Sequence, residues 1–172
     1  MDLKSKIRNI PDFPVKGIQF KDITTLLKDK DAYRHCIERI TRHCQSLKID
    51  YIAGIEARGF VIGAPVAYNL NVGLLLIRKK GRLPADVERI SYKLEYGENI
   101  LEIHRDAFKR NDRIMVIDDL LATGGTTLAV FKLIEKLKGK VVGADFIIEL
   151  EMLKGREKLK GYEIFSLVKY NI

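Results

Sequence analysis

The sequence is poor in the residues that cross-link small secreted proteins. It contains two cysteines, four prolines and no tryptophan among 172 residues, which excludes a disulfide framework. Cys36 and Cys44 are eight residues apart within one helical pattern. On a helix their Cα atoms would lie about 12 Å apart, too far for a disulfide. We therefore expect two buried structural thiols and a chain that resides in the reducing cytoplasm.

Long hydrophobic runs are also missing. No apolar run approaches the length that a bilayer requires, and residues 1–10 contain no continuous apolar stretch for a signal peptide. The apolar content of 47% argues against disorder. A chain of this length fits one domain, so we expect a single domain over residues 1–172 and no membrane association.

Several ligand and nucleotide signatures are absent as well. The three histidines, His35, His43 and His104, show no zinc-ligand spacing with the cysteines or with one another. We therefore predict no transition metal. The sequence has neither a P-loop nor a dinucleotide-binding glycine turn after a strand, and it lacks kinase and hydrolase signatures.

Acidic residues are outnumbered by basic ones, 23 to 31, which gives a formal charge of +8. Such a balance suits nucleic acid, an anionic membrane or small polyanionic substrates. Much of the charge lies in residues 78–82 and 154–160. The second cluster mixes both signs and is interpreted as a solvated surface. The first follows a predicted strand, where a ligand site is possible.

Strands alternate with helices along the chain. This alternation predicts an α/β fold with a doubly wound, mostly parallel sheet. A helix with one apolar face and a cap at Asp29 or Asp31 is expected at 29–47. Pro65 should lie near the first turn of the next helix or kink it. The expected strands are 51–55, 72–77, 114–117 and 141–148, and the later helices are 60–70 and 128–137.

Two regions do not fit this alternation. Residues 79–103 are polar and alternate weakly, and we interpret them as a long loop or flexible hairpin inserted between two core strands. Insertions of this length often act as lids. Residues 1–28, with three prolines or glycines between positions 11 and 17, are expected to form an irregular cap over the sheet. Neither region is expected to be a separate domain.

Residues 114–127 carry the strongest functional signal. The sequence Ile-Met-Val-Ile-Asp-Asp-Leu-Leu-Ala-Thr-Gly-Gly-Thr-Thr joins an apolar strand to an acid pair, a small-residue loop and a helical pattern. The bare amides of a helix N-terminus attract phosphate. Asp118 and Asp119 only accept hydrogen bonds when ionised, which suits hydroxyl groups and metal-bound water. This segment therefore predicts a sugar-phosphate site.

Two cationic loops should lie at the same sheet edge. They are residues 56–59, Glu-Ala-Arg-Gly, and residues 78–81, Arg-Lys-Lys-Gly. Ligands of open parallel sheets bind at the carboxyl ends of strands, so the loops could hold a ligand with phosphate at one end and diphosphate at the other. The alternatives are a surface salt bridge for Arg58 and plain solvation for Lys79 and Arg82.

The segment Val-Ile-Asp-Asp-Leu-Leu-Ala-Thr-Gly-Gly-Thr, residues 116–126, resembles the phosphoribosyl-diphosphate motif of the type I phosphoribosyltransferases. Over almost its whole length the chain is similar to the adenine-specific branch of this family. The order and spacing of further segments support this resemblance. They are residues 11–14, 17–23, 56–60, 78–84, 94–97 and 153–159.

This resemblance implies an enzyme of purine salvage that transfers the phosphoribosyl group of 5-phosphoribosyl diphosphate to adenine, giving AMP and diphosphate. Asp118 and Asp119 would engage the ribose hydroxyls, and Arg58 and Lys79 would face the diphosphate, with Arg82 as a further substrate contact. Mg²⁺ would bridge substrate oxygens rather than occupy a protein cage. The residues that would wrap the 5′-phosphate are Ala122, Thr123, Gly124, Gly125 and Thr126.

The resemblance also implies how the base is held. Phe20 would stack on one purine face and Leu150 would cover the other, while backbone groups near Gln19 and Lys21 would read the base edge. Displacement of diphosphate builds positive charge on the sugar, as in glycoside hydrolysis. The catalytic residues would be Arg58, the two aspartates and Glu95. Of these, Glu95 is the candidate base. Closure of the hairpin would bring Glu95 and Tyr96 into the site and exclude water.

The sequence departs from the family pattern at two places, and two alternative functions remain. Glu56-Ala57 stands where an Asp-Ser pair is common in relatives, and Lys21 stands where arginine is common. One alternative is a phosphoribosyltransferase for hypoxanthine, guanine, orotate or uracil. The other is a regulator that senses the sugar diphosphate, although residues 1–28 are too short for a winged helix. The family implies a homodimer with the Arg58 loop near the interface, and no nucleic-acid partner.

Overall fold

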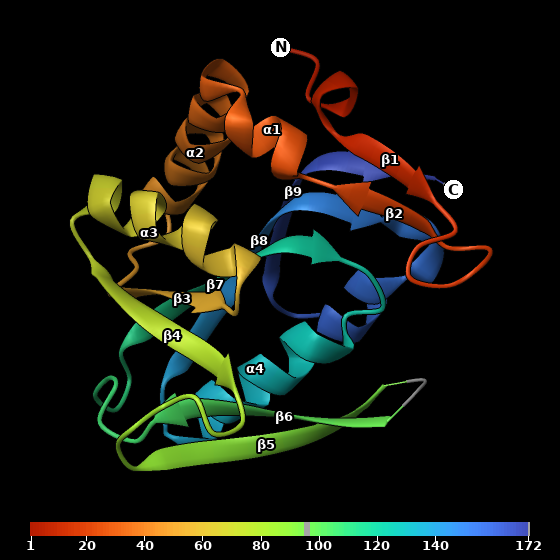
Figure 1. Cartoon of the computed structure of the whole chain (residues 1–172). Coiled ribbons are helices and arrows are strands. Elements are labelled where there is room, and N and C mark those ends of the chain that lie inside the picture. The colour runs from red at the N-terminus through yellow and green to blue at the C-terminus, as the bar shows by residue number, and fades with distance from the viewer. Residues whose placement is uncertain (95–96, 172) are drawn as a thin grey trace.

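The computed structural model describes residues 1–94 and 97–171, so the predicted Glu95 and Tyr96 lie outside the described residues. A seven-stranded sheet forms its centre, in the order β5-β6-β4-β3-β7-β8-β9 (Figure 1). The five neighbouring strands β4, β3, β7, β8 and β9 run parallel to one another. Strands β5 and β6 form an antiparallel hairpin, and β6 also pairs antiparallel with β4. Their bounds are β3 Tyr51–Ile55, β4 Gly73–Lys79, β5 Val87–Leu94, β6 Gly97–His104, β7 Arg113–Leu121, β8 Lys140–Leu150 and β9 Glu163–Tyr170.

Helices cover both faces of this sheet, as the α/β prediction requires. Helices α2 (Lys30–Gln45) and α3 (Arg58–Leu70) pack on one face, and α4 (Gly125–Lys136) packs on the other (Figure 1). The middle of β7 shows why its sequence is continuously apolar. Met115 contributes to the core cluster beneath α2 and α3, whereas Val116 contributes to the cluster beneath α4. A strand buried on both faces needs apolar residues at successive positions.

Helix α2 begins where its sequence predicts. The side chain of Asp29 accepts hydrogen bonds from the amides of Asp31 and Ala32, both at 3.1 Å, and so caps the helix. Helix α3 starts at Arg58, two residues before the predicted start, and Pro65 lies inside it rather than in its first turn. Within the described ranges, no helix combines the length and apolar character that crossing a bilayer requires.

Strand β7 extends further than predicted. It includes Asp118 and Asp119, which the sequence placed in a loop after residue 117. The cause is pairing with β8, because Asp118 is opposite Phe146 and Leu121 is opposite Glu149. The acid pair is therefore held by a strand ladder. Strand β9, at the outer edge, was not predicted.

The inserted segment is built into the sheet. Strands β5 and β6 form a hairpin whose β6 pairs with β4, with Arg78 opposite Glu102. Leu101 and Ile103 of β6 are buried, which anchors the base of the hairpin. The predicted cap contains a two-stranded antiparallel ribbon, β1 (Arg8–Pro11) and β2 (Gln19–Asp22), and the short helix α1 (Thr24–Lys28). The 3₁₀ turns are η1 (Lys4–Lys6), η2 (Glu151–Leu153) and η3 (Gly155–Leu159).

Candidate active site

Two adjoining cavities lie where β3, β4 and β7 end. Their volumes are about 450 and about 180 Å³, and they share Arg58, Asp118, Asp119 and Thr126. The three loops predicted to meet at the carboxyl edge of the sheet therefore do meet. The larger cavity is lined by Ile55, Glu56, Ala57, Arg58, Lys79, Tyr92, Asn99, Leu101, Asp118, Asp119 and Thr126.

The smaller cavity is formed around the start of α4. It is lined by residues 122–127 together with Leu120 and the shared residues. Gly124 caps the helix with a φ of 74°, a left-handed conformation that glycine adopts without strain. A Cβ on Gly124 would lie 2.5 Å from the carbonyl oxygen of Gly155. Glycine is thus required both by the turn and by the segment packed behind it, and the helix amides are presented to the cavity.

Arg58 and Asp119 join the two cavities. Arg58 Nε lies 2.7 Å from Asp119 Oδ2, and the Asp119 side chain is buried. Gly59 makes this approach possible, because a Cβ there would lie 2.5 Å from the carbonyl oxygen of Ile117. The first turn of α3 can therefore pack directly against β7. This places one guanidinium beside one carboxylate at the mouth of the sheet.

The two aspartates have perturbed acidities. Burial and the neighbouring Asp119 charge raise the pKa of Asp118 well above the ordinary value. Burial also raises the pKa of Asp119, although Arg58 opposes this rise. The amide of Asp119 donates a hydrogen bond of 2.9 Å to Asp118 Oδ1. Adjacent carboxylates held out of water are stabilised by cations or hydroxyl donors, so the pair is a candidate binding site for such groups.

The second cationic loop is organised by Glu56. Its carboxylate lies 3.3 Å from Arg78 Nε and 3.5 Å from Arg82 Nε, and it accepts a hydrogen bond of 3.0 Å from the Lys79 amide. Arg82 is thereby directed toward Glu56 and does not line either cavity among the described residues. Lys79 does line the larger cavity. The loop therefore presents Lys79 to a ligand while Glu56 fixes the neighbouring arginines.

The β5–β6 hairpin contributes residues that the sequence did not single out for the site. Tyr92 of β5 and Asn99 of β6 line the larger cavity. Thr126 Oγ1 donates a hydrogen bond of 3.2 Å to the hydroxyl of Tyr92, so the hairpin contacts the first turn of α4. The weak alternation of polar and apolar residues around Tyr92 predicted a possible strand here. It did not predict that the strand would contact α4.

The comparison with known proteins agrees with this geometry. The phosphoribosyl transferase domain family matches residues 21–168. The adenine phosphoribosyltransferase of Halothermothrix orenii is 57% identical over 169 residues, which cover 98% of this chain and 99% of that protein. The chain belongs to the adenine phosphoribosyltransferases of the type I phosphoribosyltransferase family.

Solved structures of phosphoribosyltransferases have the same fold. The crystal structure of the adenine phosphoribosyltransferase of Thermoanaerobacter pseudethanolicus is 51% identical, with a TM-score of 0.95 over 98% of each chain. That of the Saccharomyces cerevisiae protein, complexed with an imino-alditol bisphosphate and adenine, is 34% identical, with a TM-score of 0.92 over 97% of each chain. The predicted family and α/β fold are confirmed.

The phosphoribosyltransferase cap brings Phe20 to the site but turns Lys21 away. The Phe20 ring lies 5.5 Å from the Arg58 guanidinium carbon and 5.2 Å from the Phe13 ring. Lys21 Nζ instead donates to Asn9 at 2.8 Å and lies 4.5 Å from the centre of the Tyr170 ring. Of the predicted base-binding residues, Gln19 is exposed and Leu150 lies at the carboxyl end of β8.

Residues 154–160 were predicted to form a solvated surface because they mix positive and negative charges. The structure agrees with this prediction only in part. Arg156 donates to both carboxylate oxygens of the buried Glu149, at 2.9 and 2.6 Å, and to the carbonyl oxygen of Ile164 at 2.7 Å. The exposed lysines of the segment fit the prediction, but Arg156 does not. Arg156 is therefore fixed to β8 and β9 next to Gly155, which packs against Gly124 at the start of α4.

Proposed function

We infer that this chain transfers the phosphoribosyl group of 5-phosphoribosyl diphosphate to adenine, giving AMP and diphosphate in purine salvage. The observation that carries this inference is the shared border of the two cavities. There the acid pair of β7, Arg58 and the first turn of α4 face one space. Phosphate, pentose and diphosphate each find complementary groups in this space, and the full-length similarity to adenine phosphoribosyltransferases supports adenine as acceptor.

The smaller cavity would hold the 5′-phosphate. Ala122, Thr123, Gly124, Gly125 and Thr126 line it at the start of α4. Backbone amides and the positive end of the helix dipole favour a phosphate dianion at this position.

The ribose would lie across Asp118 and Asp119, whose carboxylates accept hydrogen bonds from the 2′- and 3′-hydroxyl groups. The anomeric carbon gains positive charge as the diphosphate departs. Carboxylates on the ribose side tolerate this charge, and Arg58 and Lys79 stabilise the departing diphosphate. Arg82 would join them by leaving Glu56, because its side chain is largely exposed.

The acid pair also fits Mg²⁺. Its carboxylate oxygens are the hard ligands that Mg²⁺ prefers, and Asp119 of the pair is buried beside Arg58. Asp118 and Asp119 would hold the ion through water or through the ribose hydroxyls, as in a family that is typically magnesium-dependent. When bound, the ion neutralises charge on the diphosphate.

Adenine would bind between the cap and the end of β8. The Phe20 ring, beside Arg58, offers a stacking face, Leu150 offers an apolar cover, and the backbone near Gln19 and Lys21 offers hydrogen bonds to the base edge. A stacked aromatic ring suits any base, so the discrimination comes from these backbone groups. We propose Glu95 as the base that removes the purine proton and Tyr96 as a further substrate contact.

We further propose a cytoplasmic homodimer. Four apolar side chains are exposed on α3 and β4, among them Tyr68 with 86% of its surface exposed. Clustered exposed apolar residues mark association surfaces, and a second copy of the chain would cover this one, close to the Arg58 loop. Sedimentation should give the dimer mass for the native chain and a smaller mass for Tyr68→Glu. The other three residues are Val61, Leu74 and Leu76.

The decisive assay is AMP formation from adenine and 5-phosphoribosyl diphosphate, with and without Mg²⁺. The native protein should require Mg²⁺ and prefer adenine to hypoxanthine, guanine, orotate and uracil. Arg58→Ala should lower kcat/KM by about 10- to 100-fold, the loss expected for one charged hydrogen bond. Arg110→Ala, at an exposed arginine, is the control and should retain full activity. Preference for another base would refute the acceptor assignment.

A further inference from the structure

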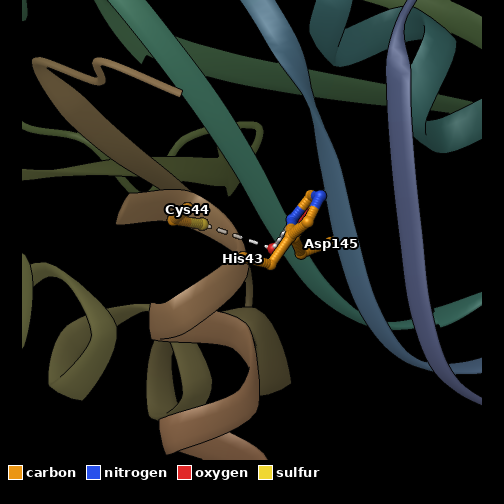
Figure 2. Close-up of side chains that lie close together, drawn as sticks. All are labelled: His43, Cys44 and Asp145. Atoms are coloured by element: carbon orange, nitrogen blue, oxygen red, sulfur yellow. Dashed lines mark hydrogen bonds and ion pairs between the residues drawn. The ribbon is translucent and has the colours of Figure 1, made fainter. Parts of the chain in front are cut away.

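A histidine, a cysteine and an aspartate meet between α2 and β8, outside the two cavities described above. His43 and Cys44 lie near the end of α2, and Asp145 lies in the middle of β8 (Figure 2). Asp145 Oδ2 is 3.0 Å from His43 Nδ1 and 3.3 Å from Cys44 Sγ. One ligand atom from each residue lies within 4.8 Å of the others. Three different metal-ligand types thus converge on one point.

The carboxylate at this point is only partly satisfied. Asp145 is fully buried, and its Oδ1 has no hydrogen-bond partner within the described part of the chain. A buried carboxylate without full hydrogen bonding is costly. A cation at the cluster would remove this cost.

The geometry fits a tetrahedral ion. Bonds of about 2.0 Å to nitrogen and oxygen and about 2.3 Å to sulfur place tetrahedral ligands roughly 3.3–3.8 Å apart. Two of the three contacts, at 3.0 and 3.3 Å, are already near this range. The third is below 4.8 Å and has to shorten by about 1 Å at most to reach that geometry.

The surroundings also fit a metal-binding histidine. His43 Nε2 lies 3.5 Å from Glu163 Oε1 of β9, and the imidazole stacks on Phe165 with ring centres 4.4 Å apart. A carboxylate on the second ring nitrogen commonly orients a histidine ligand. A cavity of about 250 Å³ borders Cys44, although neither His43 nor Asp145 lines it.

We propose that His43, Cys44 and Asp145 form a site for a zinc-class divalent cation, with Glu163 orienting the histidine. A thiolate and a carboxylate supply two negative charges to balance the ion. Binding forms metal–sulfur, metal–nitrogen and metal–oxygen bonds and releases to solvent the Cys44 thiol proton and the proton that His43 Nδ1 shares with Asp145, while His43 Nε2 keeps its proton toward Glu163. Sulfur and imidazole select zinc, cobalt or nickel over Mg²⁺, which distinguishes this site from the one at the active-site aspartates. The residue spacing did not predict it, because Asp145 is about a hundred residues from the α2 pair.

The test is titration of metal-free, full-length protein with Co²⁺, followed by displacement with Zn²⁺. The native protein should bind one equivalent with a thiolate-to-cobalt charge-transfer band and the visible bands of tetrahedral cobalt. Cys44→Ser should abolish the charge-transfer band, and Asp145→Asn should weaken binding at least about 10-fold. Glu163→Gln should weaken it about 10-fold, as expected for a residue that orients a ligand. Cys36→Ser, at a buried cysteine of the same helix, is the matched control and should behave as native.

Two results would overturn the proposal. One is that the native protein shows no charge-transfer band at one equivalent of Co²⁺. This measurement uses the native protein alone, so it does not depend on the folding of any variant. The other is a band that persists in Cys44→Ser, or native affinity in Asp145→Asn, for proteins whose circular dichroism matches native. Mg²⁺ in large excess should leave the cobalt spectrum unchanged, and displacement by Mg²⁺ would equally contradict a soft-ligand site.

Discussion

Asp118 and Asp119 are neighbours in sequence, but only Asp119 has a guanidinium within 2.7 Å. Burial, together with the charge of Asp119, raises the pKa of Asp118. The group is therefore protonated at a higher pH than an ordinary aspartate, and protonation would remove the acceptor that we propose for a ribose hydroxyl. At the residue scale, the site is a balance between two crowded carboxylates and the cations that approach them.

This balance predicts the acid limb of the pH profile. In the native enzyme, kcat/KM for 5-phosphoribosyl diphosphate should fall on acidification at a pH above the ordinary aspartate value of 3.8. Asp119→Asn removes the neighbouring charge, so the pKa of Asp118 should fall and the acid limb should move to lower pH. The plateau should decrease by about 10- to 100-fold. Identical acid limbs in the two proteins would show that this pair does not control the profile.

Gly59 offers a second residue-scale prediction. In Gly59→Ala the added Cβ would lie 2.5 Å from the carbonyl oxygen of Ile117, so the start of α3 must move and Arg58 must leave Asp119. Gly63→Ala in the same helix is the control, because the nearest atom to its Cβ would be a side-chain methyl group of Ile52 at 3.2 Å and the nearest backbone atom would be 3.7 Å away. We expect steady-state kinetics to show a kcat/KM at least about 10-fold lower for Gly59→Ala than for Gly63→Ala. Equal activity would mean that the close approach is dispensable.

At the scale of elements, the start of α4 depends on a segment that lies behind it. Gly155 of η3 packs against Gly124 and the Ala122 carbonyl group, and Arg156 fixes η3 to β8 and β9 through Glu149 and Ile164. The loop that would bind phosphate is thus held in place by an ion pair at its back.

Arg156→Met should reveal this support. The substitution leaves Glu149 buried with Lys169, 4.0 Å away, as its remaining cation, so the free energy of unfolding should fall by about 1–3 kcal/mol. The KM for 5-phosphoribosyl diphosphate should rise more than kcat falls, because the loop is displaced before chemistry. Lys158→Met, at an exposed lysine of the same segment, should change neither value. If Arg156→Met is less stable than the native protein but keeps the native KM, Arg156 contributes to stability and not to substrate binding. That result would contradict the support role.

Within the cap, Asp22 at the end of β2 anchors β1 and the start of α1 to each other through Arg8 and Thr24. Burial raises the pKa of Asp22, but hydrogen bonds from Thr24 and Arg8 outweigh it and bring the value to about 2. Because the folded pKa lies below the unfolded one, the stabilisation is present above pH 4 or so and is lost as the pH falls toward 2.

An NMR titration of the Asp22 carboxyl should therefore give a pKa of about 2. In Arg8→Met the pKa should rise but stay below 3.8, because the Thr24 hydrogen bonds remain. Acid unfolding of this variant should begin at a higher pH than in the native protein. A native pKa near 3.8 would exclude the proposed anchoring.

At the scale of the whole molecule, features formed by one continuous segment could be predicted from the sequence. Sites assembled from segments far apart in the sequence could not. Strand β3 matches its prediction because a short apolar run buried on both faces is a strong signal. Strand β9 was missed because this outer strand interrupts its apolar residues with Ser166 and Lys169. Residues 122–126 form one segment, so their motif alone was enough to propose them as the phosphate loop, and they line the smaller cavity. Tyr92 and Asn99 reach the same cavity only because a hairpin folds back onto α4.

The proposed function depends on one arrangement, in which β7 and α4 together hold a phosphorylated pentose. A crystal structure with 5-phosphoribosyl diphosphate, Mg²⁺ and a non-reactive adenine analogue measures it directly. We predict density for the 5′-phosphate on the amides of residues 122–126 and for both ribose hydroxyls on Asp118 and Asp119. A fully occupied ligand whose phosphate lies elsewhere, with these amides and carboxylates unengaged, would contradict the account.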